Sequence, residues 1–215
     1  MIILNFVSIF IVLVIGSGEY HIDSYSVDGL DIDVSFTSVN CVSGYEYSYF
    51  VDGEINSDLL FVLTKLLARE QHCIAKNPEL NVRTKVFLDS SGGFTKDAYG
   101  IGRLFRIHEV KTFINNDVAC SSACAIAFLG GTERYIFEHG IINFHQPYTI
   151  DSYIDNKPII TCSEDTTLLL QYFIEMTNDA TGTILHNRSL LYCGVDSYWQ
   201  IYGTNAALLY GIANT

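Results

Sequence analysis

The chain has 215 residues, 49% of them hydrophobic and 17% charged, which excludes an intrinsically disordered protein. This length suits one sizeable hydrophobic core and is short for two independent domains, so we expect a single domain. Aspartate and glutamate number 24 against 12 lysines and arginines, which gives a formal net charge of −12. Because a nucleic-acid backbone is repelled by this charge, we expect no nucleic-acid partner.

Residues 1–18 differ in composition from the rest of the chain. Residues 1–15 are almost wholly apolar, and the small residues 16–18 follow them. This run has the length of a signal-peptide hydrophobic region and is shorter than the roughly 20 residues that span a bilayer. We therefore interpret residues 1–18 as a signal peptide or N-terminal membrane anchor. The protein is then exported (periplasmic or secreted), or attached to a membrane through residues 1–15 and facing outward. Because no basic residue precedes the run, a buried N-terminal strand is the alternative.

The cysteine content bears on the same question. Six cysteines are present, at positions Cys41, Cys73, Cys120, Cys124, Cys162 and Cys193. In an exported chain they would most simply form three disulfides, because disulfides persist in oxidising compartments. This expectation is conditional on export.

The chain after the apolar run divides into two parts. Residues 19–46 alternate loosely between apolar and polar side chains, which predicts one or two exposed strands or an extended acidic N-terminal arm. From residue 47 onward, strand patterns alternate with helix patterns. This alternation predicts parallel βαβ units with right-handed crossovers. No linker or internal repeat interrupts residues 47–215, so we predict one α/β domain with a mostly parallel sheet.

The predicted elements follow one another closely. A helix over 57–73 begins behind an N-cap at Ser57 and ends before Asn77-Pro78. The predicted strands lie at 47–51, 85–88, 111–114, 134–137 and 141–144. The other predicted helices lie at 97–107, 122–129, 165–176 and 183–192, and a last helix–strand pair lies around 205–212.

Two predicted turns have the character of ligand sites. In parallel α/β sheets, ligands bind where strands end and turns into helices present free backbone N–H groups. The turn at 88–93 contains Gly92 and Gly93, which allow close approach of the backbone to a ligand, although such a pair is often only a turn. The turn at 118–125 puts Ser122 at the start of a helix, where a serine is usually an N-cap. His145 ends the strand at 141–144, and we expect it at the same sheet edge as Ser122, as a nucleophile and its base require.

The order of four segments resembles the proteolytic subunit of the Clp protease, within the ClpP/crotonase superfamily. The segments are Phe50-Val51-Asp52-Gly53-Glu54-Ile55, Phe87-Leu88-Asp89-Ser90-Ser91-Gly92-Gly93, Ser121-Ser122-Ala123-Cys124-Ala125 and Ile142-Asn143-Phe144-His145-Gln146-Pro147. The resemblance extends from Tyr47 to Ile212, and its Cys-x-Ser-Ala-Cys variant is closest to exported, periplasmic ClpP-like proteins of bacteria. It implies a ClpP/crotonase-like fold and an exported serine peptidase.

The resemblance also implies a Ser-His-Asp triad that cleaves peptide bonds through an acyl-enzyme. Ser122 would be the nucleophile and His145 the general base. Asp196 fits the third position by its order in the chain, although it equally fits a turn residue after Gly194. Ser121 is a rival nucleophile, which we place second because Ser122 aligns with the family pattern.

The same resemblance assigns an oxyanion hole to the backbone N–H groups of Gly93 and Ala123, with Gly92 supporting the turn. Each preorganised donor of this kind contributes on the order of 3 kcal/mol in related systems. Cys120 and Cys124 flank the proposed nucleophile. They pair either with each other or with different partners, and either arrangement would make the turn more rigid.

Other kinds of site are weaker. A zinc site built from Cys120, Cys124, His139 and His145 lacks the usual close spacing of paired cysteines, and no His-Glu-x-x-His helix is present, so we expect no metal and no cofactor. A Ser-Lys dyad like that of signal peptide peptidase would need Lys96 or Lys111.

A catalytically inactive ClpP-like scaffold or binding module is the main alternative function. An acyl-CoA enzyme of the crotonase type is less favoured because no basic clamp for a CoA phosphate is evident.

The expected partners follow from the family. The substrate would be a peptide or a protein. Clp subunits form rings through a helical handle, which residues 165–176 would supply here, so a homo-oligomer is one expectation. No docking motif for an ATPase is evident.

Overall fold

A computed structural model describes residues 7–14, 20–27, 46–76 and 83–214. The main sheet has six strands in the order β2-β1-β3-β4-β5-β7. They are β1 (Val7–Val14), β2 (Tyr20–Val27), β3 (Glu46–Asp52), β4 (Arg83–Asp89), β5 (Lys111–Ile114) and β7 (Glu133–Ile136). Strands β3, β4, β5 and β7 are parallel, whereas β1 is antiparallel to both of its neighbours. The predicted α/β class with a mostly parallel sheet is confirmed.

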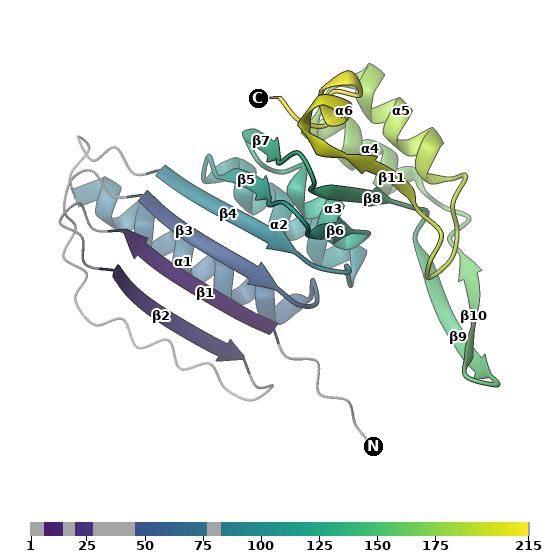
Figure 1. Ribbon diagram of the computed structural model, residues 1–215, viewed down its shortest axis with the longest axis horizontal. Helices are drawn as coiled ribbons and strands as arrows, with labels where there is room; N and C mark the ends of the chain where they lie inside the picture. The colour runs from purple at the N-terminus through teal and green to yellow at the C-terminus, as the bar shows by residue number, and fades with distance from the viewer. Residues whose placement is uncertain (1–6, 15–19, 28–45, 77–82, 215) are drawn as a thin grey trace.

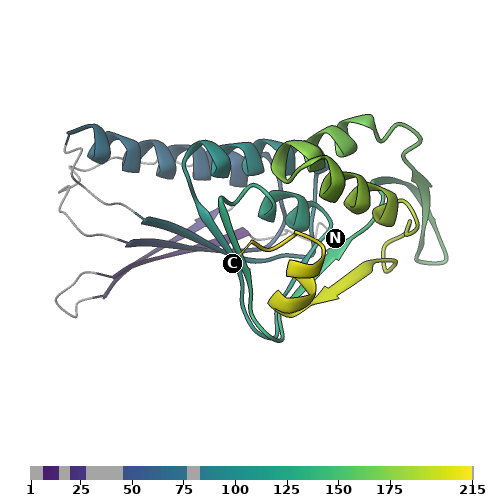
Figure 2. The ribbon, with the colours of Figure 1, turned by 90° about the horizontal axis from the view of Figure 1, so that it is seen from above.

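Three helices cover one face of this sheet: α1 (Ser57–Lys76), α2 (Thr95–Ile107) and the short α3 (Ala123–Phe128) (Figures 1 and 2). Strand β4 directs Val86 and Leu88 into the core, where both are buried. Phe87, between them, stacks with Phe50 and Phe113 of the neighbouring strands, with ring centroids 4.7 and 4.9 Å apart. The period of two along β4 therefore fixes which face receives the helices.

A second sheet of three strands in the order β11-β8-β6 continues the main one at its C-terminal edge. Its strands are β6 (Ala119–Ser121), β8 (Ile141–Phe144) and β11 (Trp199–Tyr202). Strand β8 is parallel to β6 and antiparallel to β11. A bridge between Ser90 and Cys120 links the end of β4 to β6. The two loops that follow β4 and β6 are thereby brought together.

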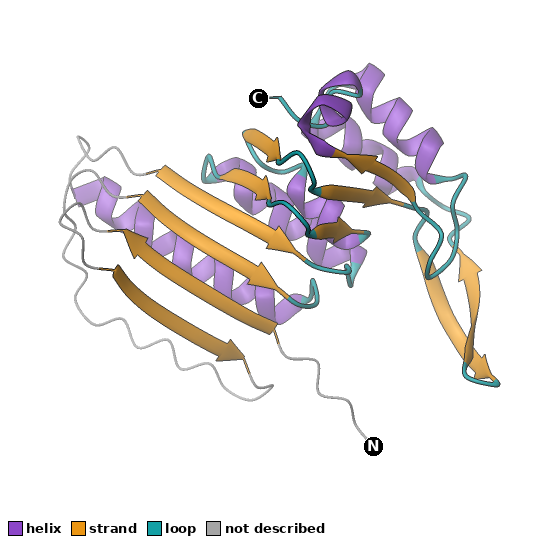
Figure 3. Cartoon of the chain, viewed as in Figure 1, coloured by secondary structure: helices purple, strands orange, loops and turns teal. Residues whose placement is uncertain are grey.

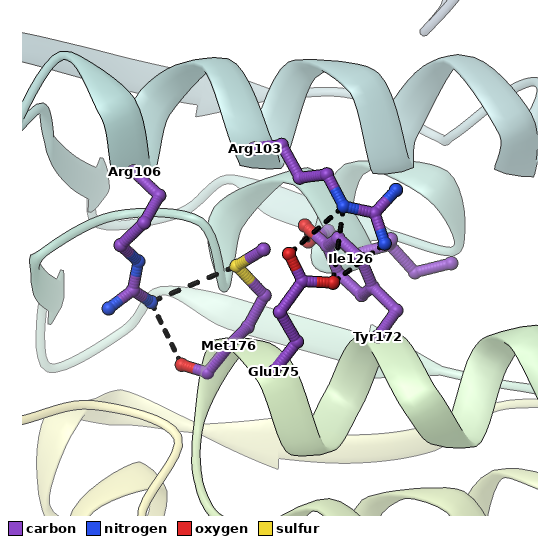
Figure 4. Close-up of polar contacts among 6 residues, drawn as sticks. All are labelled: Arg103, Arg106, Ile126, Tyr172, Glu175 and Met176. Atoms are coloured by element: carbon purple, nitrogen blue, oxygen red, sulfur yellow. Dashed lines mark hydrogen bonds and ion pairs between the residues drawn. The ribbon is translucent and has the colours of Figure 1, made fainter.

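Helices α4 (Thr167–Met176), α5 (Asp179–Ser189) and α6 (Gly203–Leu209) complete the C-terminal part. Figure 4 shows α4 held to its neighbours by polar contacts. The Tyr172 hydroxyl donates to the Ile126 carbonyl of α3 at 2.9 Å, and Arg103 of α2 forms an ion pair with Glu175. Helix α4 therefore packs against the body of the molecule, and it supports α3, the helix that follows Ser122.

The segment that projects is a hairpin that the periodicity did not predict. Strands β9 (Tyr148–Ile154) and β10 (Lys157–Cys162) form an isolated two-stranded sheet that extends away from the body (Figure 3). Almost every residue of β9 is exposed. A strand without a buried face has no selected alternation of apolar residues, which is why the sequence pattern did not reveal it.

Several predicted bounds differ from the structure by a few residues, and three differences have a clear local cause. Ser57 is the first residue of α1, and Asn56 is its cap, because its Oδ1 accepts the Leu59 N–H at 3.0 Å. Helix α5 begins earlier than predicted, at Asp179, where the Asn178 side chain accepts the Thr181 N–H. The last pair of elements has the opposite order: β11 precedes α6. The side chain of β11 that is buried, Ile201, is isolated between exposed neighbours, so it gave little strand signal.

The N-terminal residues that we interpreted as a targeting segment overlap β1. In the described range, Val7–Val14 lies between β2 and β3 in the main sheet. The remaining residues of 1–18, and most of the arm at 19–46, fall outside the described residues. Within the part of the chain that the structure describes, none of the helices has the length and apolar character needed to cross a membrane.

Two disulfides are present among the described cysteines. One joins Cys120 to Cys124, and the other joins Cys162 to Cys193. Cys41 lies outside the described residues, as does the side chain of Cys73. Of the two arrangements expected for the cysteines around Ser122, the one in which they pair with each other is therefore observed.

Candidate active site

Two turns meet at the C-terminal edge of the sheet. The Ser90 N–H donates to the Ala119 carbonyl at 3.2 Å, and the Ser121 N–H donates back to the Ser90 carbonyl at 2.9 Å. This pairing aligns the turn after β4 with the turn after β6. A Cβ added to Gly92 would lie 2.7 Å from Ser122 Cβ and 3.2 Å from Ser122 Oγ. The two turns are therefore in contact, and only glycine fits at position 92.

Ser122 has a backbone conformation that non-glycine residues rarely adopt. Its φ is 56° and its ψ is −121°, outside the three regions favoured by L-residues. The N–H of Ser122 donates to the Asn143 carbonyl of β8 at 2.9 Å, while its own carbonyl accepts the Ile126 N–H at 3.2 Å. Ser122 is partly exposed, whereas the residues on either side of it are buried. A strained, partly exposed serine between a strand and a helix is a common setting for a nucleophile.

Ser121, the rival serine, has a different environment. Its side chain is only 6% exposed, and its Oγ accepts a hydrogen bond from Asn143 Nδ2 at 2.8 Å. Asn143 Oδ1 is buried and has no hydrogen-bond partner among the residues that the structure describes. Ser121 thus belongs to a buried polar pair that joins β6 to β8.

His145 is the first residue after β8. It lies two residues beyond Asn143, which pairs with Ser121 of β6. Its Nδ1 lies 2.7 Å from the backbone carbonyl oxygen of Gln146. A carbonyl only accepts hydrogen bonds, so Nδ1 carries the proton and Nε2 of the neutral ring has the free lone pair. Burial lowers the pKa of His145, and the hydrogen bond to Gln146 opposes this shift in part. The neutral form, which is the form that acts as a base, is favoured.

The rings of Tyr148 and Tyr198 flank His145, each with its centroid 5.3 Å from the imidazole. Burial raises the pKa of both tyrosines, and the charge of Asp196 adds to this shift, in Tyr198 after the effect of Tyr148. Asp196 itself is exposed and sits in a turn closed by the Ser197 N–H and the Gly194 carbonyl. Among the described residues, no hydrogen bond joins Asp196 to His145, whose Nδ1 is engaged by Gln146 instead.

The two backbone groups predicted as oxyanion donors are available. The Gly92 carbonyl accepts the Ile55 N–H at 2.8 Å. Because a trans peptide is planar, the Gly93 N–H on the other side of that peptide points away from Ile55. Within the described ranges, neither the Gly93 N–H nor the Ala123 N–H donates a backbone hydrogen bond. Ala123 is the first residue of α3, where N–H groups have no partner inside the helix.

The other candidate groups fit less well. Cys120 and Cys124 are joined in a disulfide, so they are not thiolate ligands for zinc. Lys111 starts β5 at the opposite edge of the sheet, and its Nζ forms an ion pair with Glu133 at 2.6 Å. Lys96, in the first turn of α2, is exposed. A Ser-Lys dyad through Lys111 is therefore not supported by the geometry.

Sequence reasoning missed the part played by Gln146. Its carbonyl holds His145 Nδ1, its N–H donates to the Tyr192 carbonyl at 2.8 Å, and its Nε2 donates to the Ser163 carbonyl at 2.7 Å. These bonds attach the residue after His145 to two later segments. A backbone carbonyl has no side-chain signature, so the only signal was that Gln146 sits beside His145 in the motif.

No protein-family model matches the sequence, and curated proteins give no match to it. Solved structures do resemble its fold. A single-residue variant of the 1510-N membrane-bound stomatin-specific protease has a TM-score of 0.57 and 17% identity, over 78% of this chain and 76% of that chain. A second variant of the same protease, in complex with a substrate peptide, has the same TM-score and identity over 78% and 72%. A variant of ClpP1 from Listeria monocytogenes has a TM-score of 0.52 and 16% identity over 78% and 88%. The chain therefore has a ClpP-like α/β fold.

Proposed function

We propose that the protein is a serine hydrolase that cleaves peptide bonds through an acyl-enzyme. Ser122 Oγ attacks the carbonyl carbon of the scissile bond, and His145 Nε2 takes its proton and then gives it to the leaving amine. The N–H groups of Gly93 and Ala123 hold the oxyanion of the tetrahedral intermediate. Water then hydrolyses the acyl-enzyme, with His145 again acting as the base.

One observation carries this proposal: the strained turn at Ser122 lies against the Gly92-Gly93 turn, and each turn contributes an N–H group that has no backbone acceptor among the described residues. Backbone strain of this kind costs on the order of 1 to 3 kcal/mol and tends to persist where function requires it. A nucleophile and two free donors at one sheet edge is the arrangement that acyl transfer needs. The solved proteases of similar fold add support from the fold alone.

The proposal favours Ser122 over Ser121. Ser121 Oγ is buried and already paired with Asn143, so attack by Ser121 would require breaking a buried hydrogen bond. No hydrogen bond links Ser122 Oγ to another described residue. Such a hydroxyl needs only a rotation to meet its base, and catalytic hydrogen bonds are often long before substrate binds.

Asp196 is proposed as the third residue of the triad, acting mainly through its charge. The Gln146 carbonyl already sets the tautomer of His145, which is one of the two tasks of a triad aspartate. The remaining task is to stabilise the imidazolium that forms during attack. Because Asp196 is exposed, solvent screens its charge, and its contribution is smaller than that of a buried aspartate.

Export, and the use of residues 1–18 as a targeting or anchoring segment, remain proposals. The two disulfides support an oxidising compartment. We also propose a peptide or protein substrate and assembly into a homo-oligomer. The intact mass of the exported protein would reveal cleavage near residue 18, which would remove strand β1 from the sheet.

The proposed chemistry is tested by labelling with a fluorophosphonate probe, followed by mass spectrometry of the adduct. We expect one adduct, on Ser122, because its turn lies against the Gly92-Gly93 turn and its hydroxyl is the one that we propose His145 activates. An adduct on Ser121 would contradict the assignment of the nucleophile. A folded protein that takes no label would instead support the inactive scaffold.

The rate of this labelling should depend on pH through His145. Attack requires the neutral imidazole, and burial lowers the pKa of His145 below its usual value of 6.5. The labelling rate should therefore decline at acidic pH with a midpoint below 6.5. The measurement is the second-order labelling rate from pH 4.5 to 8.5, and a midpoint above 6.5 would contradict this assignment.

A further inference from the structure

The disulfide between Cys120 and Cys124 spans the proposed nucleophile symmetrically. Cys120 is the central residue of β6, and Cys124 is the second residue of α3. Both side chains are completely buried, while Ser122, midway between them, is partly exposed. The bond therefore joins the strand that enters the turn to the helix that leaves it.

This bond restricts the path of the chain through Ser122. The two Cα atoms are 5.1 Å apart. Four residues of extended chain would span about 13 Å, and cysteines with Cα atoms more than about 7 Å apart cannot be bridged without backbone movement. The disulfide thus excludes an extended path between the two cysteines and requires a compact turn, and Ser122 is at the centre of that turn.

The non-covalent contacts of the turn act on separate sides of it. The Ser122 N–H is held by the Asn143 carbonyl of β8, and the Ser122 carbonyl is held by the Ile126 N–H of α3. A positive φ at a serine is unfavourable and persists only when the surroundings over-determine it. The disulfide adds a covalent cross-link between the two sides, in addition to the main chain itself.

We propose that the Cys120–Cys124 disulfide is a positioning device for the nucleophile, an inference that rests on the proposed function. It holds the turn that presents Ser122 Oγ to His145 and that directs the Ala123 N–H toward the oxyanion. Both groups depend on the same backbone turn, so loosening it impairs the chemical step more than the binding of a substrate.

The second disulfide provides a contrast within the same chain. Cys162 and Cys193 are separated by 31 residues, whereas Cys120 and Cys124 are separated by 4. In the chain-entropy description, the stabilisation from a disulfide grows with the length of the loop that it closes. The short loop should therefore contribute less to global stability than the long one, while it acts directly on the turn of the nucleophile.

The test uses the Cys120→Ala and Cys124→Ala variants, their double variant, and the Cys162→Ala/Cys193→Ala double variant. Fluorophosphonate labelling gives the maximal rate of inactivation and the concentration for half-maximal rate. We expect the maximal rate to fall at least tenfold, and by the same factor, in all three variants at the nucleophile, because each removes the same bond. The half-maximal concentration should change less than twofold. In urea, their unfolding midpoint should fall less than that of the Cys162→Ala/Cys193→Ala variant.

Three outcomes would overturn the inference. The first is a maximal rate close to that of the wild type in all three variants. The second is that the two single variants lower the maximal rate by different factors and the double variant lowers it by the product of those factors. Independent effects of this kind would assign the loss to packing of the two side chains. The third is unfolding of the three variants while the Cys162→Ala/Cys193→Ala variant stays folded, which would make the bond a global stabiliser. Failure of the proposed function looks different, because either the folded wild type would take no label or Ser122→Ala would label like the wild type.

Discussion

Ser122→Ala should lower the hydrolysis of an unfolded protein substrate by at least about 10³-fold, because removing a triad nucleophile typically leaves only the contribution of the oxyanion hole and substrate binding. The substitution should not disturb the fold, since no hydrogen bond links Ser122 Oγ to another described residue. Loss of a single hydroxyl would then remove activity without a change in the unfolding midpoint. Release of dye from quenched casein measures the rate, and circular dichroism measures the fold.

Two matched variants make this result specific. Ser121→Ala removes the neighbouring hydroxyl, which is buried and bonded to Asn143, and we expect it to affect stability more than turnover. Lys96→Ala removes the exposed lysine of α2, and we expect turnover to be retained. A large loss of turnover in the Lys96 variant would support a Ser-Lys dyad, and a full rate in Ser122→Ala would disprove the proposed mechanism.

Arg134→Met should destabilise the protein by about 4 kcal/mol, because a buried group bonded to several acceptors is lost at once. Arg134, in β7, is 4% exposed. Its guanidinium donates to the Ile212 carbonyl at 2.5 Å and to the carbonyls of Leu129, Gly131 and Met176 at 3.2 Å each. These acceptors belong to the end of α3, the loop after it, the end of α4 and the C-terminal segment.

The charge of Arg134 is retained despite its burial. Burial, followed by repulsion from Arg106, lowers the pKa of Arg134 to about 10, which still leaves it protonated at neutral pH. Methionine fills a similar volume but offers no donor, so these four carbonyls and that of Gly211, which accepts from Arg134 at 3.5 Å, would each lose a donor. Urea denaturation followed by circular dichroism measures the change in the free energy of unfolding.

Arg103→Met is the matched control for Arg134→Met. Arg103 forms a bidentate ion pair with Glu175, and the two side chains are 48% and 45% exposed (Figure 4). Exposed ion pairs contribute about 1 kcal/mol or less, so this variant should stay close to the wild type. Equal destabilisation by the two substitutions would contradict the view that Arg134 joins the C-terminal segments through backbone carbonyls.

The fold class followed from the sequence because buried strands and amphipathic helices have strong periodic signals. The strand at 111–114 and the strand at 141–144 were predicted with the bounds that the structure has. Each of these strands has a neighbouring strand on both sides, and such strands are buried and need a run of apolar residues. The β9–β10 hairpin was missed because β9 is exposed almost throughout and alternate residues of β10 are at most half-buried, so burial selects their order only weakly.

The candidate site was only partly readable from the sequence. The motifs around Ser122, His145 and the Gly92-Gly93 pair identified the side chains that carry the proposed chemistry, and these assignments stay predictions until tested. The partner of His145 Nδ1 was not readable, because it is the backbone carbonyl of Gln146. Any residue type supplies such a carbonyl, so its role depends on the path of the chain alone.

The sequence by itself determined the α/β class, the strand–turn–helix units and the residue types at the two turns, because local periodicity and glycine placement encode them. Only the tertiary structure decided which groups meet. It paired Cys120 with Cys124, aligned Ser121 with Asn143, and attached Gln146 to the segment that contains Tyr192. These are contacts between segments far apart in the chain or across a sharp turn. Their geometry depends on how strands register in a sheet, which no local pattern specifies.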